Sequence, residues 1–186
     1  EERLTIPARM FLEVAKIAAE GDKADEHKES FLAFGGAKNQ AVFLFEDISI
    51  FTRLIEEDFP AYEKIIPSAF QTRAILDRGE FAKAVKLSSI FARESANIVK
   101  VKIEKKGITI SANAPQIGEN TCEVEANLEG DENEIAFNAR FLLEFLHAID
   151  SREIALEMTG PLNPGVFKIP GDDSYLHIIM PVRVQG

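Results

Sequence analysis

The sequence has 186 residues and a formal net charge of −10, with 31 acidic against 21 basic side chains. A uniformly acidic surface repels a phosphate backbone, so any contact with nucleic acid must depend on local basic clusters. The composition, 46% hydrophobic and 28% charged, argues against intrinsic disorder. The single cysteine, Cys122, excludes an intramolecular disulfide. No run of about 18 apolar residues and no secretory leader occurs, so we expect a cytosolic protein without a membrane partner.

The first predicted helix covers residues 8–20, because Pro7 suits a first helical position and Gly21 suits the residue after the end. A narrow polar stripe runs along it, made of Arg9, Glu13 and Lys16. Apolar side chains cover the rest of its circumference, namely Met10, Phe11, Leu12, Val14 and Ile17. We therefore expect only one thin face of this helix to meet solvent. Further on, residues 58–67 carry two prolines and two aromatics, which by themselves suit a linker.

The central part of the chain predicts a second helix over residues 80–94 and several strands. The helix carries Lys83, Lys86 and Arg93 on one side, with Ile90 among them. Residues 99–103 alternate apolar and charged, and Lys105-Lys106-Gly107 turns the chain into 108–110, which is a hairpin. Residues 122–128 alternate as one further strand, with Cys122 on its apolar face, so we expect a buried thiol.

The last part predicts a third helix over residues 139–149, which follows Asn138, a good N-cap. Its polar stripe consists of Arg140, Glu144 and His147. The terminal apolar strand, 175–184, is interrupted by Pro181, which favours an edge or terminus. An exposed apolar tail of this kind suits a partner-binding groove.

Internal similarity organises these elements. The segment Ile6–Ile17 resembles the segment Phe137–Ala148. The residues that follow each segment also match at one constant offset, with Leu32, Gly36 and Val42-Phe43 equivalent to Leu156, Gly160 and Val166-Phe167. Residues 72–130 follow the same plan of strand, helix and strands. We predict an α+β fold made of three β-α-β-β repeats.

The polar stripes allow two interpretations. Together they carry six basic residues, Arg9, Lys16, Lys83, Lys86, Arg93 and Arg140, against two acidic ones, Glu13 and Glu144. They are either ordinary solvated helix faces or equivalent faces that point at one polyanion. The composition does not choose between them.

Signatures of catalysis are missing from the sequence. It has no phosphate-binding loop, metalloprotease helix, nucleophile elbow or dinucleotide fingerprint. The histidines His27, His147 and His177 are scattered and suit surface or packing roles. The acidic clusters 56–58 and 172–173 suit solvated loops better than a divalent-ion site. We expect no catalytic residue, metal or cofactor, and a carboxylate-dependent nuclease has little support.

Three motifs point to a family. Phe59-Pro60-x-Tyr62 precedes Ile65-Ile66-Pro67, Ile135-Ala136-Phe137-Asn138 opens the third helix, and Met180-Pro181-Val182-Arg183 lies near the end. In order and spacing, over essentially the whole chain, they resemble the β sliding clamp of bacterial DNA polymerase III. The resemblance implies the DNA-clamp architecture, with helices on one face of antiparallel sheets. Residues 1–67 would form the second half of the clamp's middle domain and residues 68–186 its complete C-terminal domain.

The resemblance also implies a function. Clamps of this family are non-catalytic processivity factors, homodimeric rings that encircle duplex DNA without reading its sequence and line the hole with helices. The implied phosphate-contacting residues are Arg9, Lys16, Lys83, Lys86, Arg93 and Arg140. We expect that this chain alone does not close the two-subunit ring. The alternative is a peptide-binding adaptor of clamp fold that does not encircle DNA.

A hydrophobic pocket of the family captures linear motifs of the polymerase catalytic subunit, the clamp loader, translesion polymerases and repair proteins. The residues implied here are Pro60, Lys64, Ile65, Asn138, Phe141, Ile178, Ile179, Met180, Pro181, Val182 and Arg183. Their apolar members would bury Leu and Phe anchors of the peptide, while Asn138 and Arg183 would satisfy its polar groups. Lys64 stands where the family often has Arg, and Phe141 stands where Tyr is common.

Overall fold

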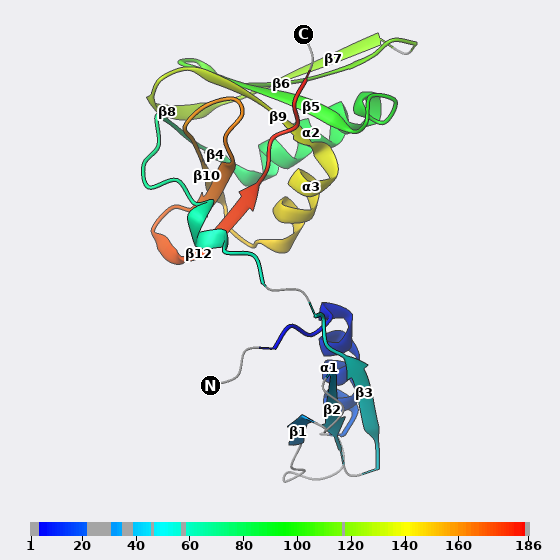
Figure 1. The fold of residues 1–186 in the computed structure, drawn as a ribbon. Helices are drawn as coiled ribbons and strands as arrows, with labels where there is room; N and C mark the ends of the chain where they lie inside the picture. The colour runs from blue at the N-terminus through cyan, green and yellow to red at the C-terminus, as the bar shows by residue number, and fades with distance from the viewer. Residues whose placement is uncertain are drawn as a thin grey trace. The chain divides into compact units, whose positions relative to one another are not determined.

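The computed structural model describes residues 4–21, 31–34, 39–45, 47–56, 59–116 and 118–184. The chain divides into two compact units, Glu1–Ala61 and Tyr62–Gly186 (Figure 1). Each unit is described by itself. None of the helices in the described parts of the chain is long and apolar enough to cross a membrane.

The described part of the first unit contains one helix and one sheet. Helix α1 (Ala8–Gly21) matches the predicted range to within one residue. The antiparallel sheet has the order β1-β2-β3, with bounds Phe31–Phe34, Gln40–Leu44 and Ser49–Arg53. The edge of the Phe11 ring packs on Phe43 of β2, at 5.9 Å between ring centres and 79° between planes.

The expectation of a single thin solvent face is wrong for α1. Phe11 is 50% exposed and Leu12 is 63% exposed, although both belong to the predicted apolar side. A helix that is apolar around most of its circumference needs several packing partners, whereas the described part of this unit offers one three-stranded sheet.

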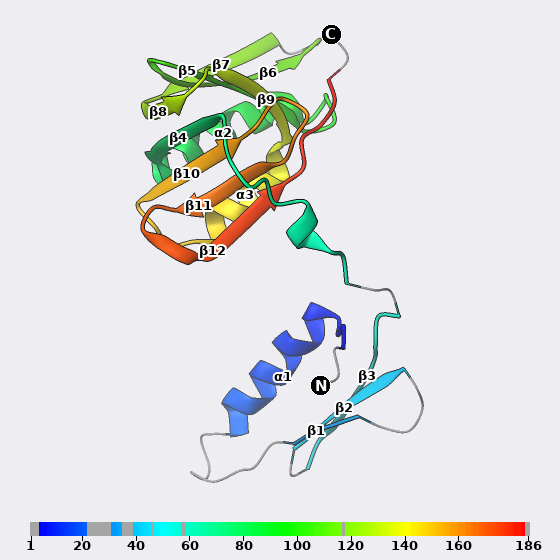
Figure 2. The same cartoon turned by 60° about the vertical axis from the view of Figure 1, so that its left-hand side comes forward.

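The second unit contains two antiparallel sheets and two α-helices (Figure 2). The larger sheet has the order β12-β11-β10-β4-β8, with bounds Asp172–Ile179, Gly165–Ile169, Glu153–Met158, Thr72–Asp77 and Ala126–Gly130. The smaller sheet has the order β7-β6-β5-β9, with bounds Gly118–Val124, Gly107–Ala114, Ile98–Glu104 and Asn133–Asn138. The helices are α2 (Arg78–Ala92), α3 (Ala139–Ala148) and the short 3₁₀ helix η1 (Tyr62–Lys64). The predicted α+β class is confirmed.

The two repeats of this unit, β4-α2-β5-β6-β7 and β9-α3-β10-β11-β12, exchange their first strands. Strand β4 leads into α2 but pairs with β10 of the other repeat, and β9 leads into α3 but pairs with β5. Equivalent backbone hydrogen bonds join the two repeats where each first strand leads into its helix. The Arg78 N–H donates to Arg152 O at 2.9 Å, and the Ala139 N–H donates to Asn97 O at 2.8 Å. Both predicted repeats of this unit are therefore present, with more strands after the helix than predicted. The repeat over residues 72–130 has β5, β6, β7 and β8 after α2, and the last repeat has β10, β11 and β12 after α3.

One hydrophobic core fills the space between both sheets and both helices. Four phenylalanines in it are fully buried, and Phe167 contacts Phe137 and Phe145 at 5.8 and 4.7 Å between ring centres. The Asn138 side chain accepts the Arg140 N–H at 3.0 Å, which confirms its role as the N-cap of α3. In α2 the cap is Asp77, whose pKa is lowered because its carboxylate accepts the Glu80 N–H.

The strand predicted over residues 122–128 is wrong in one respect, because it is two strands. Strand β7 ends at Val124 and β8 begins at Ala126 in the other sheet. The apolar alternation continues across the break because both strands turn one face to the same core. Cys122 is half-buried rather than fully buried, and its thiol donates to Asn120 Oδ1 at 3.3 Å.

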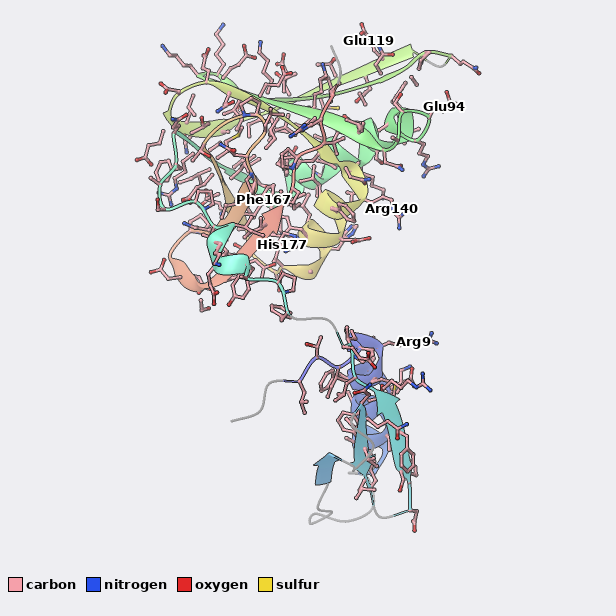
Figure 3. All side chains as sticks on the ribbon, in the orientation of Figure 1. Arg9, Glu94, Glu119, Arg140, Phe167 and His177 are labelled. Carbon is pink, nitrogen blue, oxygen red and sulfur yellow. The ribbon has the colours of Figure 1, made fainter. Side chains whose placement is uncertain are left out.

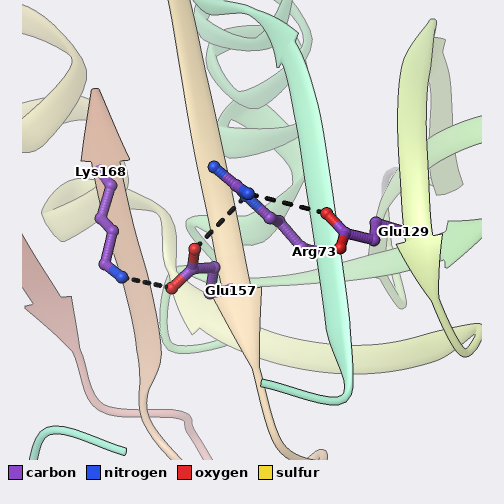
Figure 4. A network of polar contacts seen from close by, with 4 residues as sticks. All are labelled: Arg73, Glu129, Glu157 and Lys168. Atoms are coloured by element: carbon purple, nitrogen blue, oxygen red, sulfur yellow. Dashed lines mark ion pairs between the residues drawn. The ribbon is translucent and has the colours of Figure 1, made fainter. Parts of the chain in front are cut away.

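A row of charges crosses the face of the larger sheet that lies opposite the helices (Figure 4). Lys168 Nζ lies 2.7 Å from Glu157 Oε2, and Arg73 Nε lies 3.4 Å from Glu157 Oε1. Arg73 Nη1 lies 3.6 Å from Glu129 Oε2. Only 9% of the Glu157 side chain is exposed, so this carboxylate depends on its two cations for compensation.

Candidate functional site

A groove of about 510 Å³ lies between α3 and β12. Its lining consists of Phe141, Glu144, Phe145, Ala148, His177, Ile178, Ile179 and Met180. Phe141 is 54% exposed and Met180 is 59% exposed, whereas Phe145 and Ile179 are buried beneath them. The groove therefore offers apolar side chains to a ligand at its mouth and has a rigid apolar floor.

Helical and strand periodicity bring these residues together. Positions 141, 144, 145 and 148 share one side of α3, while Tyr175, His177 and Ile179 alternate on one face of β12. The His177 ring stacks on Phe145 at 4.7 Å between ring centres and 26° between planes. His177 is labelled in Figure 3. Burial lowers the pKa of His177 from its ordinary value of 6.5, so the imidazole is neutral at pH 7 and the floor is uncharged.

Basic side chains lie on the exposed sides of the helices. In the second unit α2 and α3 pack against each other, and Lys83, Lys86, Arg93 and Arg140 are all exposed. Lys83 Nζ donates to Glu80 Oε1 at 2.8 Å, and this bond raises the pKa of Lys83. In the first unit Arg9 and Lys16 are exposed on α1, and Lys16 pairs with Glu13 at 3.1 Å.

The described residues contain no group of three or more His, Cys, Asp or Glu side chains that could hold a metal ion. Asp172 instead closes a turn, since its carboxylate accepts the N–H and the hydroxyl of Ser174 at 2.8 and 2.6 Å. These bonds lower the pKa of Asp172. His27 and the acidic residues 57–58 lie outside the described residues.

Two other cavities lie in the second unit, and several charged or polar side chains line each of them. One, of about 490 Å³, includes Lys100 and Asn113 of the smaller sheet. The other, of about 720 Å³, surrounds the 105–107 turn and includes Glu104, Glu123 and Glu132. The groove beside α3 is the more apolar site and has the character of a peptide-binding surface.

Comparison with known families bears directly on this site. The family model described as "DNA polymerase III beta subunit, C-terminal domain" matches residues 63–183. The chain belongs to the DNA polymerase III beta subunit family. A beta sliding clamp of Staphylococcus aureus is 30% identical over 184 residues, which cover 98% of this chain and 47% of that protein.

Solved structures agree with this beta-subunit membership. The sliding clamp of Bacillus subtilis superimposes with a TM-score of 0.80 at 28% identity, covering 98% of this chain and 47% of that one. The beta subunit of Thermotoga maritima gives a TM-score of 0.73 at 27% identity, covering 83% of this chain and 41% of that one. The predicted clamp architecture is confirmed. The chain spans about half the length of the beta-subunit relatives that it matches.

The groove unites four of the residues that the beta-subunit resemblance assigns to peptide capture, Phe141, Ile178, Ile179 and Met180. The chain after them runs beside β9, where the Val182 N–H donates to Ala136 O at 2.8 Å, with Pro181 half-buried and Arg183 exposed. Asn138 precedes α3 and uses its side-chain oxygen for the cap. Lys64 and Ile65 are exposed and are absent from the groove lining, and Pro60 lies in the first unit.

Sequence reasoning missed four residues of the groove, Glu144, Phe145, Ala148 and His177. The sequence pattern puts Glu144 in a polar stripe, and His177 belongs to no recognisable motif. The signal was available in the spacing. Phe145 and Ala148 follow Phe141 and Glu144 by four residues, and His177 precedes Ile179 by two on a strand, so each shares a face with a predicted or lining residue.

Proposed function

We propose that this chain acts as part of a DNA polymerase processivity clamp, which encircles duplex DNA and tethers partner proteins through linear peptides. Membership of the beta-subunit family supports the first part. The groove between α3 and β12 supports the second, and it carries the proposal because it places two half-exposed apolar side chains, Phe141 and Met180, over a buried neutral floor. The role is non-catalytic.

The proposed domain organisation follows the same family. Residues 1–67 are the second half of a middle domain, and residues 68–186 are a C-terminal domain. The start of the family match at residue 63 and the boundary between the compact units after Ala61 support a division in this region. In the proposed assembly two complete subunits form the ring.

Peptide capture by the groove is driven by burial of apolar anchors. A Leu or Phe side chain that becomes fully buried contributes roughly 1.5–3 kcal/mol, so two anchors suffice for a weak, exchangeable complex. We propose that Asn138, Pro181, Val182 and Arg183 extend this surface, and that Pro60, Lys64 and Ile65 contribute to it. The partners would be the polymerase catalytic subunit, the clamp loader, translesion polymerases and repair proteins.

Binding to duplex DNA would use the exposed lysine and arginine side chains of the helices. We propose loose phosphate contacts for Lys83, Lys86, Arg93 and Arg140, and likewise for Arg9 and Lys16. Lys86, Arg93 and Arg140 form no ion pair with another described residue, so these charges remain available to phosphates. Such contacts are independent of base sequence, as a sliding protein requires.

Peptide capture is tested by fluorescence anisotropy with a labelled Gln-Leu-x-Leu-Phe peptide. We expect saturable binding to the chain and a large loss of affinity in Met180→Ala and Phe141→Ala. Leu162→Ala is the matched control, because Leu162 is 62% exposed, much like Met180 at 59%, but does not line the groove. Equal affinity in all three variants, or no binding to the parent chain, would refute peptide capture by this groove.

DNA contact is tested by the salt dependence of binding to a short duplex. Each phosphate contact contributes about −0.9 to the slope of log K against log salt, so Lys83→Ala with Lys86→Ala should reduce the slope by about two. Lys105→Ala with Lys106→Ala is the control, because these exposed lysines lie in the turn between β5 and β6 and belong to neither helix. An equal effect in both pairs would contradict the assignment. Peptide binding without any DNA binding would favour the adaptor.

A further inference from the structure

Glu144 is the one residue of the groove lining that carries a charge at pH 7. The other lining residues are apolar except for His177, which burial keeps neutral. Glu144 is exposed and forms no ion pair with another described residue. The groove thus combines an apolar floor with one uncompensated negative charge at its side.

We propose that Glu144 is a specificity-determining residue and that the groove selects peptides in which a lysine or arginine flanks the apolar anchors. The inference rests on the proposed function of peptide capture and goes beyond it by naming the charge of the preferred partner.

The geometry provides a path for such a side chain. Helix α3 and strand β12 run in opposite directions (Figure 1). Phe141, near the start of α3, therefore lies at the end of the groove near Met180, which follows β12. Glu144 lies about one helical turn further along, at the level of the Phe145–His177 stack. The methylene stem of Lys or Arg covers apolar surface while its charged head reaches outward. The stem would lie on the half-buried His177 ring, which stacks on Phe145, and the head would reach the carboxylate.

Neighbouring charges do not cancel this preference. Arg140 and His147 share the polar stripe of α3 with Glu144, but neither lines the groove, and neither forms an ion pair with Glu144. Figure 3 shows Arg140 directed away from the β12 side of the helix.

The test compares peptides that differ only in charge. A labelled Gln-Leu-x-Leu-Phe peptide is prepared with Lys, Gln or Glu at each position that flanks the anchors, and anisotropy is measured on the 186-residue chain. We expect about two- to five-fold tighter binding of the Lys peptide than of the Glu peptide at one flanking position, in line with an exposed ion pair. The preference should shrink between about 50 mM and about 500 mM salt.

Variants assign the preference to Glu144. Glu144→Gln should abolish it and Glu144→Lys should reverse it. Glu94→Gln is the control, because Glu94 is also exposed but lies outside the groove, and it should leave the preference unchanged. A preference that survives Glu144→Gln, or no preference at any position, overturns the inference.

Failure of the inference can be told apart from failure of the proposed function. If the Gln peptide binds and Met180→Ala abolishes its binding, the groove captures peptides, and only the charge preference is in question. If the Gln peptide does not bind, both the function and the inference are wrong.

Discussion

Replacing Gly165 with alanine tests how closely the strand beside the groove is packed. Gly165 is buried at the start of β11 and is the register partner of Ile179 on β12. An added Cβ would lie 2.4 Å from Phe137 Cζ, 3.0 Å from Phe137 Cε1 and 3.4 Å from Leu156 Cδ1. Phe137 is fully buried and its ring contacts Phe167, so it cannot rotate away without disturbing the core.

The expected magnitude is the difference of two effects. Alanine for glycine in an extended segment restricts the unfolded chain and stabilises the fold by about 0.4–1 kcal/mol. Overpacking a close-packed core costs about 1–3 kcal/mol. Because the added atom would overlap a fixed ring, we expect the second effect to win, with a net loss of about 1–2 kcal/mol in the free energy of unfolding.

The assay is urea unfolding followed by circular dichroism, with Gly160→Ala as the control. An added Cβ at Gly160 meets only Asn163 Nδ2, at an ordinary 3.6 Å, so we expect a change within about 0.5 kcal/mol. Displacing β11 also moves β12, so Gly165→Ala should weaken peptide binding to the groove. A Gly165→Ala protein as stable as the parent would refute the packing argument.

Three further predictions concern polar groups of the second unit. Glu157→Gln leaves Arg73 and Lys168 without their shared carboxylate and should lower the free energy of unfolding by about 1–2 kcal/mol. The loss should be smaller than for a fully buried ion pair, because the Arg73 and Lys168 side chains are 29% and 40% exposed. Glu129→Gln should lower the free energy of unfolding by less than about 0.5 kcal/mol, because the Glu129 side chain is 65% exposed. Equal losses in the Glu157 and Glu129 variants would contradict the reasoning. Asn138→Ala removes the N-cap of α3 and should lower stability by about 1 kcal/mol, measured by urea unfolding, whereas Asn138→Ser should retain most of it. Burial holds the pKa of His177 below 6.5, so the unfolded chain binds this proton more readily than the folded one. The free energy of unfolding should therefore fall as the pH drops below about 6.5. Between about pH 7.5 and about pH 5.5, His177→Phe should lose less stability than the parent chain. An equal loss in both proteins would contradict this expectation.

Local features of the fold could be predicted from the sequence by itself. The bounds of α1 and α3, the Asn138 cap and the 99–110 hairpin follow from periodicity and from preferences of single residues, which act over a few neighbouring positions. Family membership was also accessible, because the motifs around Pro60, Asn138 and Met180 keep their order along the chain. Such signals need no knowledge of which distant segments meet.

Only the tertiary structure decided which strands pair and which side chains converge. A period of two cannot show that the chain changes sheets at Glu125, because the alternation is the same on either side of the break. Apolar periodicity likewise did not show that Phe11 and Leu12 lie half-exposed, since it records the capacity to pack but not the presence of a partner. The groove itself depends on Phe145 of α3 meeting His177 of β12, two residues brought together by a core that both repeats build jointly. Long-range pairing is selected by the packing of the whole unit, and that information lies in no single segment.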